Sequence, residues 1–279
     1  MWNDSLKIGV ENIDRQHETL FAKVDELIDE MIDLNNGECQ RDKIISTILF
    51  LKDYAVTHFA DEEAYQLSIS DPRYEKHKKQ HESFIATVLK HEAKLVASDF
   101  AHNDVSKFTS TLLAWLIHHV SDVDQKIGKA VEDAGEAGHA DIIRECFCNV
   151  IGNMIDADKD SIVKVREHNE SFDGAITVRH TFTHVIEGCA VFDFSVPFIK
   201  ALIRSVSNMT PDEIGDFEKT FVLQTSTMAI EDIYRRLDVD EYAINDVEIS
   251  VVGKEEPRPD ERTAFDTGSG IVEIGLAIT

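Results

Sequence analysis

Apolar residues recur at helical spacing through the first half of the chain. Four stretches carry this pattern: 11–34, 40–65, 72–98 and 104–132. Apolar residues three and four positions apart lie on one face of a helix, so each stretch predicts an amphipathic helix. Asp71-Pro72 is a typical helix start, with the aspartate as cap and the proline at the first helical position. Four such helices with short connections predict an all-α, antiparallel four-helix bundle.

The pattern changes after a glycine-rich break at residues 135–138. Helical patterns follow at 140–156, 197–207 and 212–236, and β-type or alternating runs at 162–165, 175–178, 188–194, 246–253 and 270–278. The charged stretch 254–269, which contains Pro257 and Pro259, is predicted to be a flexible loop. Strands with helices on one face predict an α+β domain. We therefore expect two domains, residues 1–135 and 138–279.

Composition narrows the classes of partner and compartment. The formal net charge of −25 argues against nucleic acid and anionic membrane surfaces, which both need a basic face. No apolar run approaches the ~18 residues of a membrane span. The first residues show no secretory signal pattern, and the chain has only 4 cysteines. A reducing cytoplasm is the expected location.

Histidines and carboxylates stand at ligand spacing on the predicted helices. His58 and Glu62 are four residues apart in the second helix, and His77 and His81 are four apart in the third. This spacing places each pair on one helix face, one turn apart. The first helix adds His17. Imidazoles and carboxylates on facing helices of a bundle build dinuclear iron and manganese sites.

The fourth helix offers two alternative carboxylates. His119 and Asp124 are five residues apart, about 140° around an ideal helix. Asp122 is three residues from His119 and four from His118, so it shares a helix face with them more closely. Spacing alone therefore favours Asp122 as the carboxylate of this helix.

Residues 1–133 resemble the hemerythrins in their bacterial form. The resemblance rests on the Trp2 region, Asp14-Arg15-Gln16-His17, His58-Phe59-Ala60-Asp61-Glu62-Glu63, the His77 and His81 pair, and Trp115, His119 and Asp124. By position it implies two non-heme irons with an oxo or hydroxo bridge. One iron is bound by His77, His81 and His119, and the other by His17 and His58.

The same resemblance assigns the remaining residues. It implies that Glu62 and Asp124 bridge the irons and that Phe59 and Trp115 line an apolar ligand pocket. It thus favours Asp124 over Asp122, which requires a long reach or a local distortion of the helix. These donors leave one position of two six-coordinate irons open, on the iron with two histidines. An open position beside a second reducible iron suits dioxygen.

The second half resembles the CheX-like chemotaxis phosphatases of the CheC/CheX group in its order of elements. That family acts on a phosphorylated response-regulator aspartate through a Glu-x-x-Asn motif on its long helix. Gln224 and Thr227 stand at the corresponding positions here, so the motif is not met. We therefore expect this half to be an interaction or dimerisation module, and we do not expect it to have phosphatase activity.

Together these features predict a non-enzymatic, oxygen- or redox-responsive diiron protein. Its second domain would form a homodimer or dock a response regulator or another chemotaxis protein. A store or carrier of oxygen with a passive second domain is the nearest alternative. An oxygen-gated phosphatase, a diiron oxidase or peroxide-handling protein, and a protein that handles nitric oxide or iron are further alternatives.

Overall fold

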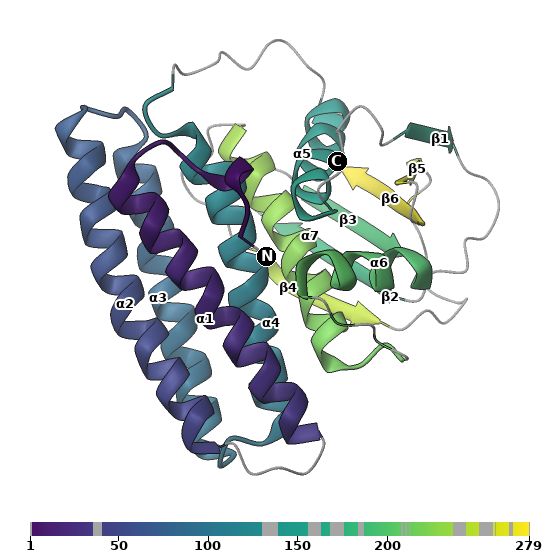
Figure 1. Ribbon diagram of the computed structural model, residues 1–279. Coiled ribbons are helices and arrows are strands. Elements are labelled where there is room, and N and C mark those ends of the chain that lie inside the picture. The colour runs from purple at the N-terminus through teal and green to yellow at the C-terminus, as the bar shows by residue number, and fades with distance from the viewer. Residues whose placement is uncertain are drawn as a thin grey trace. The chain divides into compact units, whose positions relative to one another are not determined.

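The computed structural model divides into two compact units, Met1–Glu132 and Asp133–Thr279, and each is described by itself (Figure 1). The structure describes residues 2–35, 41–129, 139–155, 163–167, 176–183, 187–207, 209, 211, 213–236, 244–250, 259, 261–267 and 270–278. The glycine-rich boundary expected at 135–138 lies outside these residues.

The first unit is the predicted four-helix bundle. Its helices are α1 (Glu11–Asn35), α2 (Arg41–Ser68), α3 (Tyr74–Ala97) and α4 (His102–His118). Helix α1 packs against α2 and α4, and α3 packs against the same two helices. The helices form because their apolar stripes meet in a common core, where Phe21, Val24, Leu27, Val105 and Leu113 are buried.

Helix α3 begins two residues later than the sequence suggests. Pro72 and Arg73 form a turn ahead of Tyr74. Asp71 still organises this turn, because its Oδ1 accepts a hydrogen bond from the Arg73 N–H at 2.8 Å. Its Oδ2 accepts from the Gly128 N–H at 2.7 Å, which ties the α2–α3 connection to the segment that follows α4.

The fourth predicted helix is not one uninterrupted α-helix. It ends as an α-helix at His118 and continues as a π-helical turn, η2 (His119–Val123), and a 3-10 turn, η3 (Asp124–Lys126). The Asp124 N–H donates to the carbonyl of His119, five residues back. A π turn brings residues five apart onto one face, and such turns recur at functional sites. This is the local distortion that the spacing of His119 and Asp124 requires.

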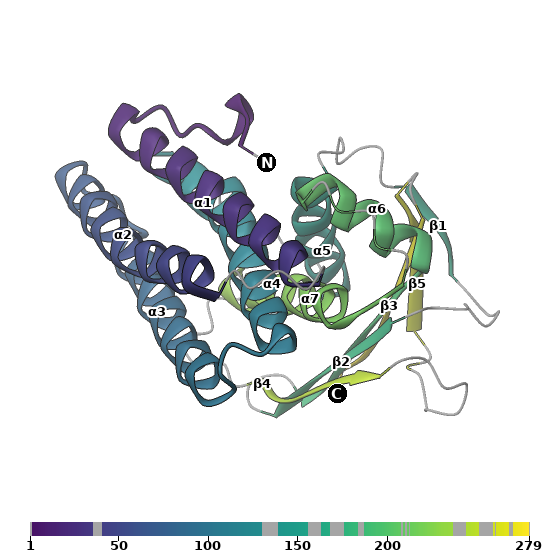
Figure 2. The same cartoon turned by 60° about the horizontal axis from the view of Figure 1, so that its bottom comes forward.

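The second unit is α+β, as predicted. Its helices are α5 (His139–Ile155), α6 (Val196–Ser207) and α7 (Asp216–Arg236). Its strands are β1 (Val163–Glu167), β2 (Ile176–Thr183), β3 (Glu187–Phe194), β4 (Ile244–Ser250), β5 (Glu261–Asp266) and β6 (Ile271–Ile278). The described strands pair antiparallel in the order β1-β5-β6-β3-β2-β4. Figure 2 shows the three helices on one face of this sheet.

Aromatic residues join the sheet to its helices. Phe147 of α5 stacks on Phe192 of β3 with ring centroids 5.2 Å apart, and it also lies near Phe194 and Phe265. Phe265 belongs to β5, so the prediction of a flexible loop over 254–269 is wrong for this part. Strand β5 pairs with β1 and β6, which satisfies its backbone groups. Its charged ends concealed its buried centre, Ala264 and Phe265.

Among the helices that the structure describes, none combines the length and apolar composition needed to cross a membrane.

Candidate metal centre

Three histidines meet at one point inside the bundle. The Nε2 atoms of His77 and His81, from α3, lie 3.1 Å apart. The Nε2 atom of His119, at the start of the π turn, lies 3.1 Å from His77 and 3.0 Å from His81. Three imidazole nitrogens directed at each other at this range mark the position of a shared partner, such as a metal ion.

A second pair of histidines lies beside the first group. His17 of α1 and His58 of α2 have ring centroids 4.6 Å apart, with one edge against the other face. The resemblance to hemerythrins implies the same division into three and two histidines.

Two carboxylates stand between the groups. Glu62 Oε2 lies 3.3 Å from His81 Nε2, 3.5 Å from His77 Nε2 and 3.9 Å from His58 Nε2. It therefore faces both the group of three histidines and the pair.

Asp124 makes the corresponding contacts from the other side. Its Oδ1 lies 3.2 Å from His77 Nε2 and 3.1 Å from His119 Nε2, while its Oδ2 lies 3.2 Å from His17 Nε2. Each carboxylate thus reaches both groups, which is the arrangement needed to bridge two metal ions.

The other carboxylate considered for this helix lies elsewhere. Asp122 Oδ2 accepts from the Lys126 ammonium group at 2.5 Å. The structure therefore brings Asp124, and not Asp122, to the five clustered histidines.

Burial and hydrogen bonding show that these residues fit a cation. The five clustered histidines, Glu62 and Asp124 are all buried. Both carboxylate oxygens of Glu62 and of Asp124 lack a hydrogen-bond partner among the described residues. Buried carboxylate oxygens without partners are costly, so they point to a positive partner. This set of imidazole and carboxylate donors suits iron.

The pKa shifts show the same demand for positive charge. Burial opposes ionisation of Glu62, but the imidazoles of His77 and His81 hold its pKa at about 2. Burial also opposes the charged form of His77, yet Asp124 and Glu62 raise its pKa to about 10. Burial lowers the pKa of His58 to about 4, which keeps its ring neutral at pH 7 with a free lone pair. The two carboxylates therefore attract a cation to the place where the imidazoles meet.

The rings of two α3 histidines are fixed by side chains of α2. The amide of Gln66 lies 2.9 Å from His77 Nδ1, and Glu63 Oε1 lies 3.1 Å from His81 Nδ1. Glu63 therefore holds the orientation of the His81 ring. Contacts of this kind set the tautomer and orientation of a metal-binding ring.

His58 has a similar support from α1. Its Nδ1 lies 3.2 Å from Gln16 Oε1, and Gln16 Nε2 donates to Asp61 at 2.7 Å. Sequence reasoning missed Gln16 and Gln66 as functional residues. Gln66 stands one helical turn after Glu62, and that spacing is the signal that could have found it.

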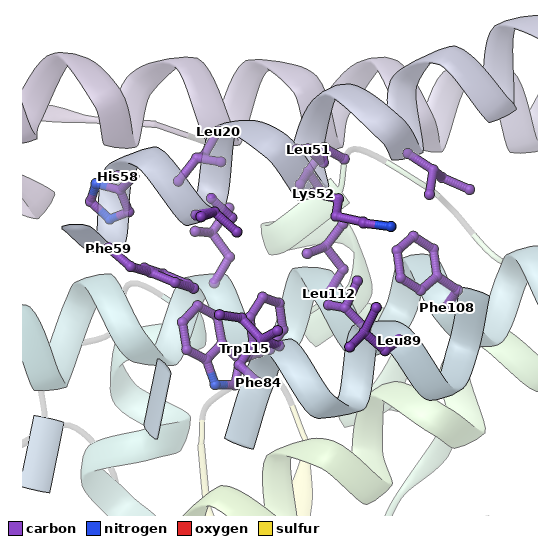
Figure 3. Close-up of a pocket in the computed structure, with 17 residues that line it drawn as sticks. Leu20, Leu51, Lys52, His58, Phe59, Phe84, Leu89, Phe108, Leu112 and Trp115 are labelled. Carbon is purple, nitrogen blue, oxygen red and sulfur yellow. The ribbon is translucent and has the colours of Figure 1, made fainter. Parts of the chain in front are cut away.

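An apolar cavity of about 90 Å³ adjoins His58, one of the two paired histidines (Figure 3). His58, Phe59 and Trp115 all belong to its wall. Phe59 stacks on His81 with ring centroids 3.9 Å apart, and Trp115 stacks on His119 at 4.1 Å. The two aromatic residues predicted to line a pocket thus connect the cavity wall to the rings of His81 and His119.

Comparison with known proteins agrees with this geometry. Residues 8–131 match the family model of the hemerythrin HHE cation binding domain. The bacteriohemerythrin of Clostridium acetobutylicum is 30% identical over 129 residues, which cover 45% of this chain and 96% of that protein. The chain belongs to the hemerythrin family. Its hemerythrin domain is also 29% identical to the bacteriohemerythrin of Stenotrophomonas maltophilia, over 47% of this chain and 81% of that protein.

A myohemerythrin is related as well. The myohemerythrin of Riftia pachyptila is 26% identical over 45% of this chain and 88% of that protein. The hemerythrin matches account for a metal-binding first unit.

Solved structures of chemotaxis proteins are similar to the other half of this hemerythrin-family chain. Chemotaxis protein CheX from Vibrio vulnificus has a TM-score of 0.44 and 11% identity, over 51% of this chain and all of that chain (100%). A CheX-CheY complex from Borrelia burgdorferi has a TM-score of 0.39 and 12% identity, over 50% of this chain and 97% of that chain.

Proposed function

We propose that the hemerythrin domain holds two non-heme iron ions and binds dioxygen reversibly. His77, His81 and His119 hold one iron, and His17 and His58 hold the other. Glu62 and Asp124 bridge the two. When bound, the irons supply an exchangeable coordination position together with two reducible centres.

The observation that carries the proposal is the place where the apolar cavity meets the ligands. Its wall includes His58, a member of the group with only two histidines. That group has the fewest protein donors, so the open position belongs there. A small neutral molecule in the cavity therefore lies beside the coordination position that the protein does not fill.

The chain's own residues then favour a neutral ligand. Phe59 has no hydrogen-bonding side-chain group and Trp115 has only its indole N–H, so water and hydrated anions lose polar partners when they enter the cavity. Gln16 and Gln66 hold the rings of His58 and His77 in place. Because these rings are held in place, the site changes little between its oxygen-free and oxygen-bound forms, which suits reversible binding.

We assign the second unit a signalling role, as a surface for a second copy of the chain or for a response regulator. This makes the whole chain an oxygen or redox sensor. Phosphatase activity is not expected, because Gln224 and Thr227 stand where the Glu-x-x-Asn motif would have its acid and its amide. An oxygen carrier with a passive second unit is the second candidate, favoured by the same cavity.

Iron stoichiometry and oxygen titration of the full chain test the proposal. The wild type should bind two irons and show a visible absorption change in air that reverses when oxygen is removed. Asp124→Asn should lose at least one iron, because Asp124 reaches both histidine groups.

Asp122→Asn is the matched control. It lies two residues away and pairs with Lys126, so it should retain both irons. Equal iron content in the two variants would contradict the ligand assignment. An absorption change that never reverses would exclude reversible binding and favour an oxidase.

A further inference from the structure

Four large apolar side chains are exposed on the neighbouring helices α2 and α3. Leu49 and Val56 of α2 are 47% and 51% exposed. Leu89 and Val96 of α3 are 48% and 65% exposed. In each helix the two residues are seven apart, which is two turns, so both lie on one side of their helix. Apolar residues at this spacing are typical of a helix that packs against a partner, and we call these four residues the α2–α3 seam.

An ion pair between the two helices sets the level of the seam. Lys52 Nζ lies 2.9 Å from Glu92 Oε2. Helices α2 and α3 are consecutive and joined by a short turn, so they run antiparallel (Figure 1). Leu49 precedes Lys52 by three residues, and on α3 Val96 follows its ion-pair residue by four. Leu49 and Val96 therefore lie at one level, about 5 Å from the ion pair, and the other two seam residues lie at one level on its other side.

The seam is electrically neutral in a strongly acidic chain. The formal net charge is −25, so two copies of the chain repel one another in general. Within the seam, one lysine and one glutamate lie at the same level between two apolar levels. Such a face is complementary to itself, because a second copy can present its lysine to this glutamate and its glutamate to this lysine.

The positions of these charges favour one symmetry operation. A two-fold axis parallel to α2 and α3, midway between two facing seams, places α2 of one copy over α3 of the other. Lys52 of each copy then faces Glu92 of the other, and each apolar level meets an apolar level. A two-fold axis perpendicular to the helices would instead place Lys52 over Lys52 and Glu92 over Glu92, and like charges at an interface are unfavourable.

Charges at the edges of the seam agree with the parallel axis. Lys52 points towards α3, so Asp53, which is 100° further around α2, lies on the outer side of that helix. Glu92 points towards α2, so Lys90, which is 200° away, lies on the outer side of α3. Asp53 and Lys90 are both exposed. The parallel axis places the outer side of α2 over the outer side of α3 of the other copy, which brings Asp53 of one copy opposite Lys90 of the other.

We propose that the α2–α3 seam is an interface for a second copy of this chain, formed about a two-fold axis parallel to the two helices. The interface goes beyond the proposed function, because it lies on the first unit and needs neither iron nor dioxygen.

Sedimentation of the purified full chain tests the interface, over about 1 to 100 µM, where an interface of modest size dissociates. The wild type should associate as its concentration rises. Lys52→Glu places like charges opposite each other, so its dissociation constant should rise by at least about tenfold. Lys43→Glu is the matched control, because it makes the same change of charge on the same helix. Lys43 is exposed and stands nine residues before Lys52, on the opposite side of α2, so this variant should associate as the wild type does.

A mixture of two variants tests the pairing of the charges. Glu92→Lys alone should also associate poorly, because lysines then face lysines. An equal mixture of Lys52→Glu and Glu92→Lys restores opposite charges across the interface, so the mixture should regain the association that each variant alone has lost.

The outcomes are decisive for the seam. A wild type that stays monomeric at about 100 µM overturns the interface, and so does a mixture that does not regain association. Equal losses in Lys43→Glu and Lys52→Glu would assign the effect to net charge and overturn it too. Association that Lys52→Glu leaves unchanged belongs to another surface, such as the second unit, which overturns the seam and leaves the proposed function intact.

Discussion

Replacing Gln66 by leucine should weaken metal binding although Gln66 is not one of the seven proposed ligands. Gln66 is buried, and its amide contacts His77 Nδ1 at 2.9 Å. If His77 binds through Nε2, its proton must lie on Nδ1, which then needs an acceptor. The Gln66 Oε1 atom has no partner among the described residues, and a half-turn of the amide brings it to this position.

The size of the loss in metal affinity depends on which nitrogen of His77 carries the proton. Without metal, the raised pKa of His77 keeps protons on both of its nitrogens, but in Gln66→Leu the ring can release the Nδ1 proton and keep the Nε2 proton, which faces Asp124 Oδ1 at 3.2 Å. Metal binding requires the remaining proton to lie on Nδ1, and in Gln66→Leu no acceptor is there. An unsatisfied buried donor costs about 1–3 kcal/mol, which matches a loss of about 10–100-fold in metal affinity. The penalty therefore appears on binding and not in the metal-free fold.

Anaerobic competition with a chelator measures this affinity, with cobalt(II) as a second probe. Gln66→Glu is the matched variant, because its carboxylate can accept the same hydrogen bond and should retain tight binding. The thermal midpoint of each metal-free variant should be recorded beside it. Affinity in Gln66→Leu within twofold of the wild type would refute the reasoning.

Two further predictions concern the second unit. Burial lowers the pKa of His180 to about 4, whereas a histidine in the unfolded chain has a pKa of about 6.5. Between pH 7 and pH 5 the unfolded state therefore binds more protons, and the free energy of unfolding should fall by about 2 kcal/mol. Urea denaturation read out by amide exchange in β2 checks this, and His180→Gln should remove the loss. Gly270→Ala should cost about 3 kcal/mol, because the new Cβ would lie 2.5 Å from the Phe198 backbone nitrogen and the residue has φ +153°. Thermal unfolding of each variant measures this cost. Gly9→Ala isolates the backbone contribution, because Gly9 has φ +86° and no atom lies within 4 Å of the new Cβ. Equal losses of stability in the two variants would contradict the steric argument.

The sequence predicted the grouping of ligands on α2 and α3 because a spacing of four residues fixes a shared helix face. His119 and Asp124 were different. Their five-residue spacing fits no regular α-helix, so only the resemblance favoured Asp124, and the π turn supplies the geometry. Gln66 could not be identified in advance, because the importance of an amide depends on the ring that faces it.

The second unit was predictable in class but not in topology. Alternating residues predicted β6, whose central part is buried, but alternation does not say which strand lies beside it. Strand β1 pairs with β5 through Val163 and Asp266, about a hundred residues apart, and nothing local encodes that contact. The same separation in sequence explains why β5 was not predicted. Its residues form a strand because they pair with β1 and β6.

The π turn at the end of α4 also links the metal centre to the start of the chain. An α-helical register over the same residues would turn everything after it by about 100° and shift it by about 1.5 Å. Gln125 follows immediately, and its amide donates to the carbonyls of Leu6 and Lys7 at 3.0 and 3.2 Å. A change of register that withdraws Asp124 from the histidines would therefore pull on the N-terminal segment, whose Trp2 ring lies 6.2 Å from that of His17. The position of this segment would then report which register the helix has adopted.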